Sequence, residues 1–104
     1  MAQSAVIHQP RVAWDGARAF VRAAGSEHSE RFAARVLSRL GSETYGHFAD
    51  TRHRLLTALV ETGGDRYASD VEAGKWRVWL EDLLRTRPEL TEAVSELSAE
   101  AMQL

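Results

Sequence analysis

The side chains with the best spacing for metal binding lie between residues 43 and 50. Glu43, His47 and Asp50 stand at positions i, i+4 and i+7, so a helix would place two carboxylates and one imidazole on one face, as a metal site requires. Tyr45 and Phe48 would point to the opposite face. The three polar residues are therefore predicted to face solvent, without a pocket and without the supporting hydrogen bonds that orient metal ligands. We expect no bound metal and no cofactor.

Residues suited to catalysis are present but form no recognisable motif. Serine, histidine and aspartate occur, yet no Gly-x-Ser-x-Gly sequence places a serine on a strained turn. Gly63-Gly64 lacks the following lysine and the preceding strand of a phosphate-binding loop. The carboxylates fall on polar helix faces, and His53 is interpreted as a residue at the boundary of an apolar face. The chain is predicted not to be an enzyme and to have no catalytic residue.

Glycine, proline and apolar periodicity divide the chain into five predicted helices. In the first, apolar residues recur with helical spacing, and Pro10 and Gly25 suit its start and its end. Ser26 and Ser42 each follow a glycine and are predicted to cap the second and third helices. The predicted helices span about residues 10–25, 26–41, 42–63, 65–87 and from 88 onward.

These helices predict an all-α fold, a compact bundle of four to five helices. No useful length of the chain alternates with the two-residue period of a strand. Residues 1–9 carry little pattern and are predicted to be a flexible N-terminus, and residues 10–104 are predicted to be a single helical-bundle domain. The predicted core contains the following larger apolar residues: Phe20, Phe32, Leu37, Phe48, Leu55, Leu59, Trp76, Trp79, Leu80, Leu83, Leu90, Val94 and Leu97.

The predicted fourth helix has two apolar faces. Trp76 and Leu80 share one side, whereas Tyr67 and Val78 lie nearly opposite them on a straight helix. This pattern predicts either burial on two sides or a kink near Gly74. A central helix that touches several neighbours accounts for the pattern best.

Composition excludes several classes of function. The chain has 104 residues with 13 basic and 15 acidic side chains, a net charge of −2 and no cysteine. This charge does not favour nucleic-acid binding, and the lack of cysteine excludes a disulfide framework and a thiolate metal site. No apolar run approaches the roughly 20 residues of a membrane span, and MAQSAVIHQP lacks the pattern of a secretion signal. A cytoplasmic protein is expected.

The first predicted helix is basic and aromatic. Arg11, Arg18 and Arg22 share one side with a single acidic residue, and Trp14 and Phe20 lie on or beside the apolar face. A helix of this kind can lie on an anionic membrane surface. An ordinary bundle helix with an arginine-rich outer face would look the same, and on the sequence alone it is favoured.

The predicted last helix is acidic. Glu89, Glu92, Glu96 and Glu100 follow Pro88 without a basic residue, so the domain is basic early and acidic late. Docking of the two ends, within one chain or between chains, is one interpretation. A solvated acidic face is the simpler interpretation and is favoured.

A longer motif covers about residues 41–97. It combines an acid-Thr-Arg step on a helix, a short acidic turn, a Trp-x-x-x-Leu-x-x-Leu-Leu ladder and a Pro-acid-Leu break. The matching residues are Asp50-Thr51-Arg52, Gly64-Asp65, Trp76, Leu80, Leu83-Leu84, Pro88 and Leu90. This pattern resembles the Bell domains of actinobacteria, which are regarded as bacterial counterparts of the fungal HeLo and HELL cell-death domains.

The resemblance implies a cell-death effector of bacterial immunity and antiphage defence, which targets or permeabilises the inner face of the cell membrane when clustered. Its partner would be an NLR-type receptor that acts through amyloid-type signalling, and the active form would be a homo-oligomer. Trp14 and Phe20 would insert, while Arg11, Arg18 and Arg22 would bind anionic headgroups. In longer members a Gly/Asn/Gln-rich signalling motif follows the helical domain, and no such motif occurs up to the last residue of this sequence.

Two other functions stay open. One is a small helical adaptor that binds a protein partner, a regulator or an immunity-type protein, through an exposed apolar patch and without membrane activity. The other is a small enzyme or ligand carrier, which would need a buried polar cluster in a pocket. The first helix distinguishes an effector from an adaptor: if it lies in the centre of the core, its release is costly and the adaptor is favoured.

Overall fold

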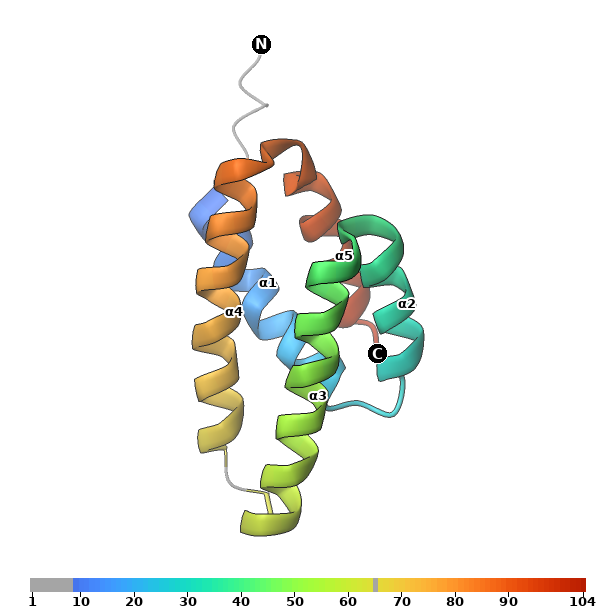
Figure 1. Cartoon of the computed structure of the whole chain (residues 1–104), viewed down its shortest axis with the longest axis vertical. Helices are drawn as coiled ribbons and strands as arrows, with labels where there is room; N and C mark the ends of the chain where they lie inside the picture. Colours follow the sequence, from blue (N-terminus) through green and yellow to red (C-terminus); the bar gives the residue numbers. More distant parts are fainter. Residues whose placement is uncertain (1–8, 65) are drawn as a thin grey trace.

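The structure, a computed structural model, describes residues 9–64 and 66–104, and within these ranges it contains helices and no strand. Residues 1–8 of the predicted flexible N-terminus lie outside the described residues. The fold is an all-α bundle, as predicted (Figure 1). Its elements are α1 (Gln9–Ala24), α2 (Ser29–Leu40), α3 (Ser42–Thr62), α4 (Tyr67–Thr86), the 3₁₀ helix η2 (Pro88–Leu90) and α5 (Thr91–Ala101).

Glycines set two of the helix boundaries. Gly41 has a φ of 96° and joins α2 directly to α3, and Gly63 ends α3 with a φ of 75°. Both values lie in the left-handed region that favours glycine. The two predicted serine caps are wrong. Ser26 instead shapes the turn before α2, where its hydroxyl accepts the His28 N–H at 3.1 Å, and Ser42 is the first residue of α3 behind a glycine that has no side chain to cap it.

The central helix of the bundle is α1. It packs along α4 and α5 and also contacts α2 and α3 (Figure 1). The prediction that the fourth helix is central is wrong, because α4 packs mainly on α1. Small residues on α1 let its neighbours approach closely. The buried residues of α1 are Ala13, Gly16, Ala17, Ala19, Phe20, Val21, Ala23 and Ala24.

Gly16 lies where α1 comes closest to α4 and α5. A Cβ atom at this position would lie 2.9 Å from Leu80 Cδ1 and 3.1 Å from Val94 Cγ1. Alanine favours a helix by about 1 kcal/mol over glycine, but crowding a packed core costs about 1–3 kcal/mol. We therefore expect Gly16→Ala to lower the free energy of unfolding by about 1 kcal/mol in urea denaturation.

The control for this prediction is Gly46→Ala on α3. A Cβ atom at Gly46 would have no other atom within 4 Å, so only the helix preference acts and stability should rise by up to about 1 kcal/mol. A stabilising Gly16→Ala substitution would contradict the close approach of α1 to its neighbours.

Aromatic rings form the middle of the core. Phe20 meets Phe32 and Trp76 edge to face, with ring centroids 5.3 and 5.1 Å apart, and Phe32 lies 5.5 Å from Phe48. Edge-to-face aromatic pairs add stability beyond the area that they bury. This cluster joins α1, α2, α3 and α4, so the rings from four helices hold the bundle at one level.

Most of the predicted core is confirmed. The prediction that Leu37 and Leu59 belong to the core is wrong, since they are 44% and 55% exposed. Helical periodicity identifies an apolar stripe, but it does not tell how far a neighbouring helix extends along that stripe. The predicted core residues that are buried are Phe20, Phe32, Phe48, Trp76, Leu80, Val94 and Leu97, and those that are partly buried are Leu55, Trp79, Leu83 and Leu90.

Only one of the two apolar faces of α4 is buried. Trp76 and Leu80 face the core, whereas Tyr67 and Val78 are 71% and 59% exposed. The helix continues without interruption through Gly74 and runs straight in Figure 1. Burial on two sides is therefore wrong, and the second apolar face belongs to the surface of the molecule.

Residues that carry the resemblance to Bell domains hold the helices together. Trp76 Nε1 donates a hydrogen bond to Thr51 Oγ1 at 2.9 Å and so joins α4 to α3. Arg52 Nη1 donates to the carbonyls of Ala24 at 2.8 Å and Ser26 at 3.0 Å, which satisfies acceptors at the C-terminal end of α1. These motif residues have structural roles in the bundle.

Candidate interaction surface

The structure separates the five residues predicted to bind a membrane or a partner. Arg11, Arg18 and Arg22 are exposed on α1, and Trp14 is 45% exposed. Phe20 is fully buried in the aromatic core. Insertion of Phe20 into a membrane stays a prediction that requires the bundle to open, because its ring cannot reach a partner while the bundle is intact.

Two of the exposed side chains have contacts within the chain. Arg11 and Asp15 form an exposed ion pair at 3.7 Å, and the Arg77 guanidinium lies over the Trp14 ring, 5.4 Å from its centroid. Exposed contacts of these kinds contribute about 0–1 kcal/mol each, so both side chains remain available for binding.

Arg18 and Arg22 lie together with Arg66, which precedes α4. All three line a groove of about 480 Å³ between α1, α3 and α4, and also a second groove of about 740 Å³ between α1 and α5. None of the three forms an ion pair among the described residues. This basic cluster, Arg18–Arg22–Arg66, borders two concave surfaces and keeps its charges open to solvent.

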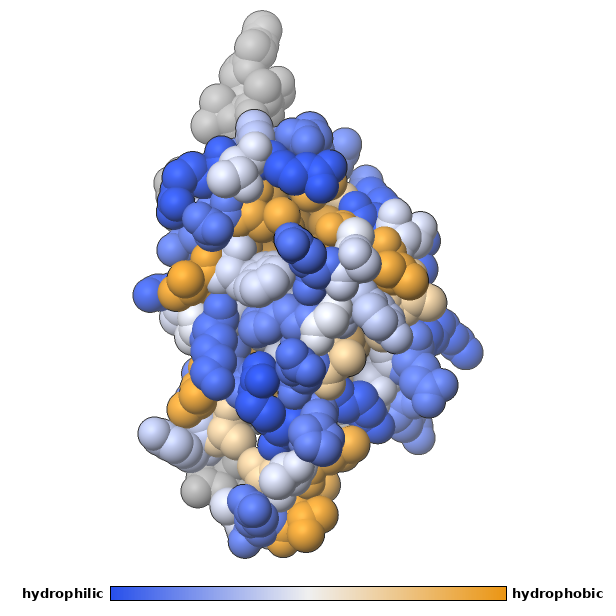
Figure 2. All heavy atoms as spheres, in the orientation of Figure 1, coloured by the Kyte–Doolittle hydropathy of each residue, from blue (hydrophilic) through white to orange (hydrophobic). Residues whose placement is uncertain are grey.

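Apolar side chains gather at the end of the molecule where α3 and α4 are joined. Leu56, Leu59 and Val60 are 42%, 55% and 86% exposed, and Figure 2 shows apolar residues at this end. Leu56 and Leu59 also line the 480 Å³ groove beside the basic cluster. Apolar and basic side chains therefore share one surface.

The acidic helix α5 is docked on α2. Arg35 donates to both carboxylate oxygens of Glu100 at 3.1 and 2.7 Å, and Arg39 donates to Glu96 at 2.7 Å. These carboxylates are ion-paired rather than only solvated. These carboxylates bind arginines of α2 and are therefore not available to the arginines of α1.

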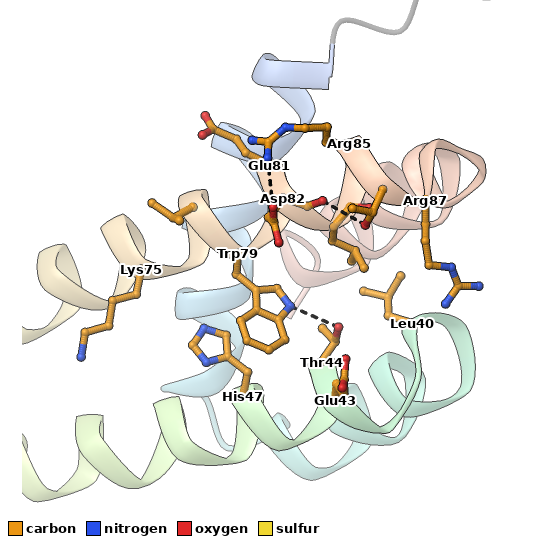
Figure 3. A pocket seen from close by; sticks show the side chains of 13 residues that line it. Leu40, Glu43, Thr44, His47, Lys75, Trp79, Glu81, Asp82, Arg85 and Arg87 are labelled. Carbon is orange, nitrogen blue, oxygen red and sulfur yellow. Dashed lines mark hydrogen bonds and ion pairs between the residues drawn. The ribbon is translucent and has the colours of Figure 1, made fainter.

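Another groove, of about 820 Å³, lies between α3 and α4 (Figure 3). In it the rings of His47 and Trp79 stack, with centroids 4.4 Å apart and planes 14° apart, and Trp79 Nε1 donates to Thr44 Oγ1 at 3.2 Å. The prediction that His47 faces solvent together with Glu43 and Asp50 is wrong, because α3 turns the imidazole toward the tryptophans of α4.

His47 is held in its neutral form by these surroundings. Burial lowers the pKa of His47 below its ordinary value of 6.5, and the charge of Arg54 lowers it further, against weaker opposite effects of Glu72 and Asp50. The folded state therefore binds this proton less tightly than the unfolded chain does. Stability is highest above the ordinary pKa and falls as the pH decreases from there toward the folded pKa.

This shift gives a pH-dependence prediction. We expect the Tm to fall as the pH is lowered from about 7 to about 5, and we expect His47→Phe, which keeps an aromatic ring and removes the titration, to flatten that fall. Circular dichroism melts of both proteins across this range measure the effect, and NMR titration of the imidazole locates the pKa. An imidazole that titrates at 6.5 or higher would contradict the prediction.

Glu72 is a buried carboxylate in an ion-pair network. It is 4% exposed, accepts hydrogen bonds from Arg54 Nε and Nη2 at 2.8 and 2.9 Å, and lies 3.5 Å from Lys75 Nζ. Burial alone raises the pKa of Glu72, but Arg54, Lys75 and a hydrogen bond from Thr51 together outweigh it and hold the pKa below its ordinary value. Glu72 lines none of the three grooves, so the network is a structural tie between α3 and α4.

Within residues 9–64 and 66–104, no three His, Asp or Glu side chains converge as metal ligands would. Among the described helices, none combines the length and apolar character needed to cross a bilayer.

Sequence reasoning missed two components of the surface. Arg66 follows Gly64-Asp65 and precedes α4, and only the fold brings it to Arg18 and Arg22. The sequence does indicate the exposure of Leu59, since this residue lies in the last turn before Gly63, where a long helix can extend past its neighbours.

Comparisons with family models, with curated proteins and with solved structures gave no match to this chain.

Proposed function

We propose that this chain is a non-enzymatic helical adaptor domain, which binds a protein partner as an intact bundle. The observation that carries the proposal is the apolar surface at the joined end of α3 and α4, where Leu56, Leu59 and Val60 are exposed beside a complete core. Exposed apolar patches with a polar border are typical of protein-binding sites.

The central position of α1 supports an adaptor over a helix that leaves the bundle. Release of α1 would expose Phe20, whose burial stabilises the fold by about 2 kcal/mol, and would also uncover Trp76 and Leu80 on α4. A small domain has about 5–15 kcal/mol of stability in total. Removing the central helix would therefore use much of that stability before any membrane contact is gained.

The resemblance to Bell domains supports a setting in bacterial immunity. The partner would then be an NLR-type receptor or a regulator in the cytoplasm, and the domain would pass on a signal by being recruited or clustered. Clustering raises the effective concentration of weak sites, so a modest surface can bind firmly when several copies are joined.

A second candidate function is the membrane-permeabilising cell-death effector that the same resemblance implies. One observation favours it: Arg11, Arg18 and Arg22 are exposed on α1, and Trp14 beside them is 45% exposed. Arginines with a neighbouring tryptophan suit an anionic membrane surface. This function would use the outer side of α1, or it would require the bundle to open.

Site-specific photo-crosslinking in living cells tests the adaptor. A photoreactive phenylalanine analogue replaces Leu59 at the apolar end in one full-length protein, and Ala34, an exposed residue of α2 that lines neither groove of the basic cluster, in another. We expect a discrete adduct with one protein at position 59 and none at position 34.

Dye release from anionic liposomes tests the second candidate. The domain is fused to a tetramerising coil, and the same fusion carries Arg11→Glu, Arg18→Glu and Arg22→Glu as its control. We expect no release from either fusion. Release that depends on the arginines, together with no adduct at position 59, would replace the adaptor with the membrane effector.

A further inference from the structure

The groove between α1, α3 and α4 is lined by apolar side chains, called here its floor, and by basic side chains, called here its border. Its floor includes Leu55 and Leu56, which are partly buried and 42% exposed, respectively. The border carries the basic cluster Arg18–Arg22–Arg66, and Asp70 is the one carboxylate among the described lining residues. An occupant therefore meets apolar side chains and, among the described lining residues, more arginines than carboxylates.

Within residues 9–64 and 66–104, the arginines of this cluster form no ion pair with a carboxylate. Seven of the twelve arginines in the chain pair with carboxylates in the described residues. Arg18, Arg22 and Arg66 are not among them. The acidic helix that might have complemented them is engaged elsewhere, since Glu96 and Glu100 bond to α2. Among the described lining residues, the three arginines outnumber the single carboxylate of Asp70, so a partner with negative charge would complement the groove.

We infer that this groove binds an amphipathic helix of a partner protein, one with an apolar stripe bordered by Asp and Glu side chains. The inference rests on the proposed adaptor function and gives the partner its chemistry. Helices commonly bind grooves by laying an apolar stripe on the floor, and arginine forks form two parallel hydrogen bonds with carboxylates.

Two other occupants fit these observations less well. A second copy of the chain would have to offer a free acidic helix, yet Glu96 and Glu100 on α5 are engaged with α2. A flat anionic membrane can reach the arginines, but it does not enter a concave groove to contact Leu55. A separate acidic helix satisfies both the charge and the shape.

Fluorescence anisotropy tests the inference with a synthetic helical peptide of about four turns. The peptide carries leucines at i, i+3, i+4 and i+7 spacing and glutamates on both sides. A second peptide keeps the leucines and replaces every glutamate with lysine. We expect the acidic peptide to bind the full chain, the lysine peptide to bind at least about tenfold more weakly, and added salt to reduce the difference.

The matched variants separate local contacts from overall charge. Arg18→Glu/Arg22→Glu/Arg66→Glu is expected to weaken acidic-peptide binding at least about tenfold. The control Arg31→Glu/Arg85→Glu/Arg87→Glu makes the same change in net charge on exposed residues outside the groove and should bind within about twofold of the wild type. Leu56→Ser/Leu59→Ser tests the floor and should also weaken binding, with far-UV circular dichroism confirming that each variant is folded.

Several results would overturn the inference. These are equal binding of both peptides, equal loss in the two triple variants, vesicle binding that needs the basic cluster while the acidic peptide does not bind, or self-association of the chain through the cluster in analytical ultracentrifugation. The adaptor function fails separately. If the adduct at position 59 forms in cells but is unchanged by Arg18→Glu/Arg22→Glu/Arg66→Glu, the adaptor stands and the acidic-helix inference is wrong.

Discussion

Trp76→Ala is expected to lower the free energy of unfolding by about 4 kcal/mol and the Tm by roughly 20 °C. Trp76 is fully buried and lies at the centre of the ring contacts, edge to face with Phe20 and 4.3 Å from the His47 ring. Its removal leaves a cavity, and it also leaves the Thr51 hydroxyl without the indole donor. Because a small domain has about 5–15 kcal/mol of stability, this single change takes away a large share.

Urea denaturation followed by far-UV circular dichroism measures this effect. Trp76→Phe is the matched variant: it keeps a ring in the core but loses the N–H, and we expect a loss of about 1–2 kcal/mol. Val60→Ala, at a position that is 86% exposed, should change stability by less than about 0.5 kcal/mol. A loss below about 2 kcal/mol for Trp76→Ala would show that the core does not depend on this ring.

Arg54→Ala should cost about 3 kcal/mol, because it leaves the buried Glu72 carboxylate without its main partner. This expected loss lies at the lower end of the range for buried ion pairs, since Arg54 itself is 40% exposed and Lys75 stays 3.5 Å from the carboxylate. Arg85→Ala breaks an ion pair with Asp82 whose side chains are 71% and 68% exposed. That control should cost less than about 0.5 kcal/mol.

The pH dependence of Arg54→Ala gives a second readout. In the wild type the folded state lowers the pKa of Glu72 below its ordinary value of 4.5, so its contribution to stability is present above that value and is lost as the pH falls through the folded pKa. Without Arg54 the effect of burial is opposed less, and the pKa of Glu72 rises. The stability difference between wild type and variant should therefore shrink on acidification, and an unchanged difference would contradict the buried ion pair.

A double variant separates the ion pair from simple packing. Arg54→Met/Glu72→Leu replaces both charges with apolar groups of similar volume, and we expect a stability within about 1 kcal/mol of the wild type. A double variant as unstable as Arg54→Ala would mean that the hydrogen bonds, rather than the unpaired charge, dominate.

The helices were predictable because their limits follow from local chemistry. Gly41 and Gly63 adopt left-handed backbone conformations that other residues avoid, and Pro88 opens a short 3₁₀ helix after α4. These signals act on the chain in any tertiary context. The predicted caps at Ser26 and Ser42 are wrong, because Ser26 lies in the turn before α2 and Ser42 is already the first residue of α3.

The arrangement of the helices was not predictable in the same way. The large rings of Trp76 and Trp79 predict that their helix is central. In the structure α1 is the central helix, because its alanines and Gly16 allow close contact on several sides. A helical wheel predicts that His47 faces solvent, because it does not show that a neighbouring helix brings a tryptophan beside it. The basic cluster likewise depends on Arg66, a residue whose position only the fold determines.

The central place of α1 also affects how the protein is made. Among the described helices α1 is synthesised first, and Trp76, which packs on Phe20, follows 56 positions later in the chain. At about 5–20 residues per second, synthesis would take roughly 3–11 s to supply that ring. Because the apolar side of α1 packs mainly on α4 and α5, the bundle cannot close before these helices are synthesised. Nascent chains that stop before α4 would leave Phe20 exposed to chaperones and proteases.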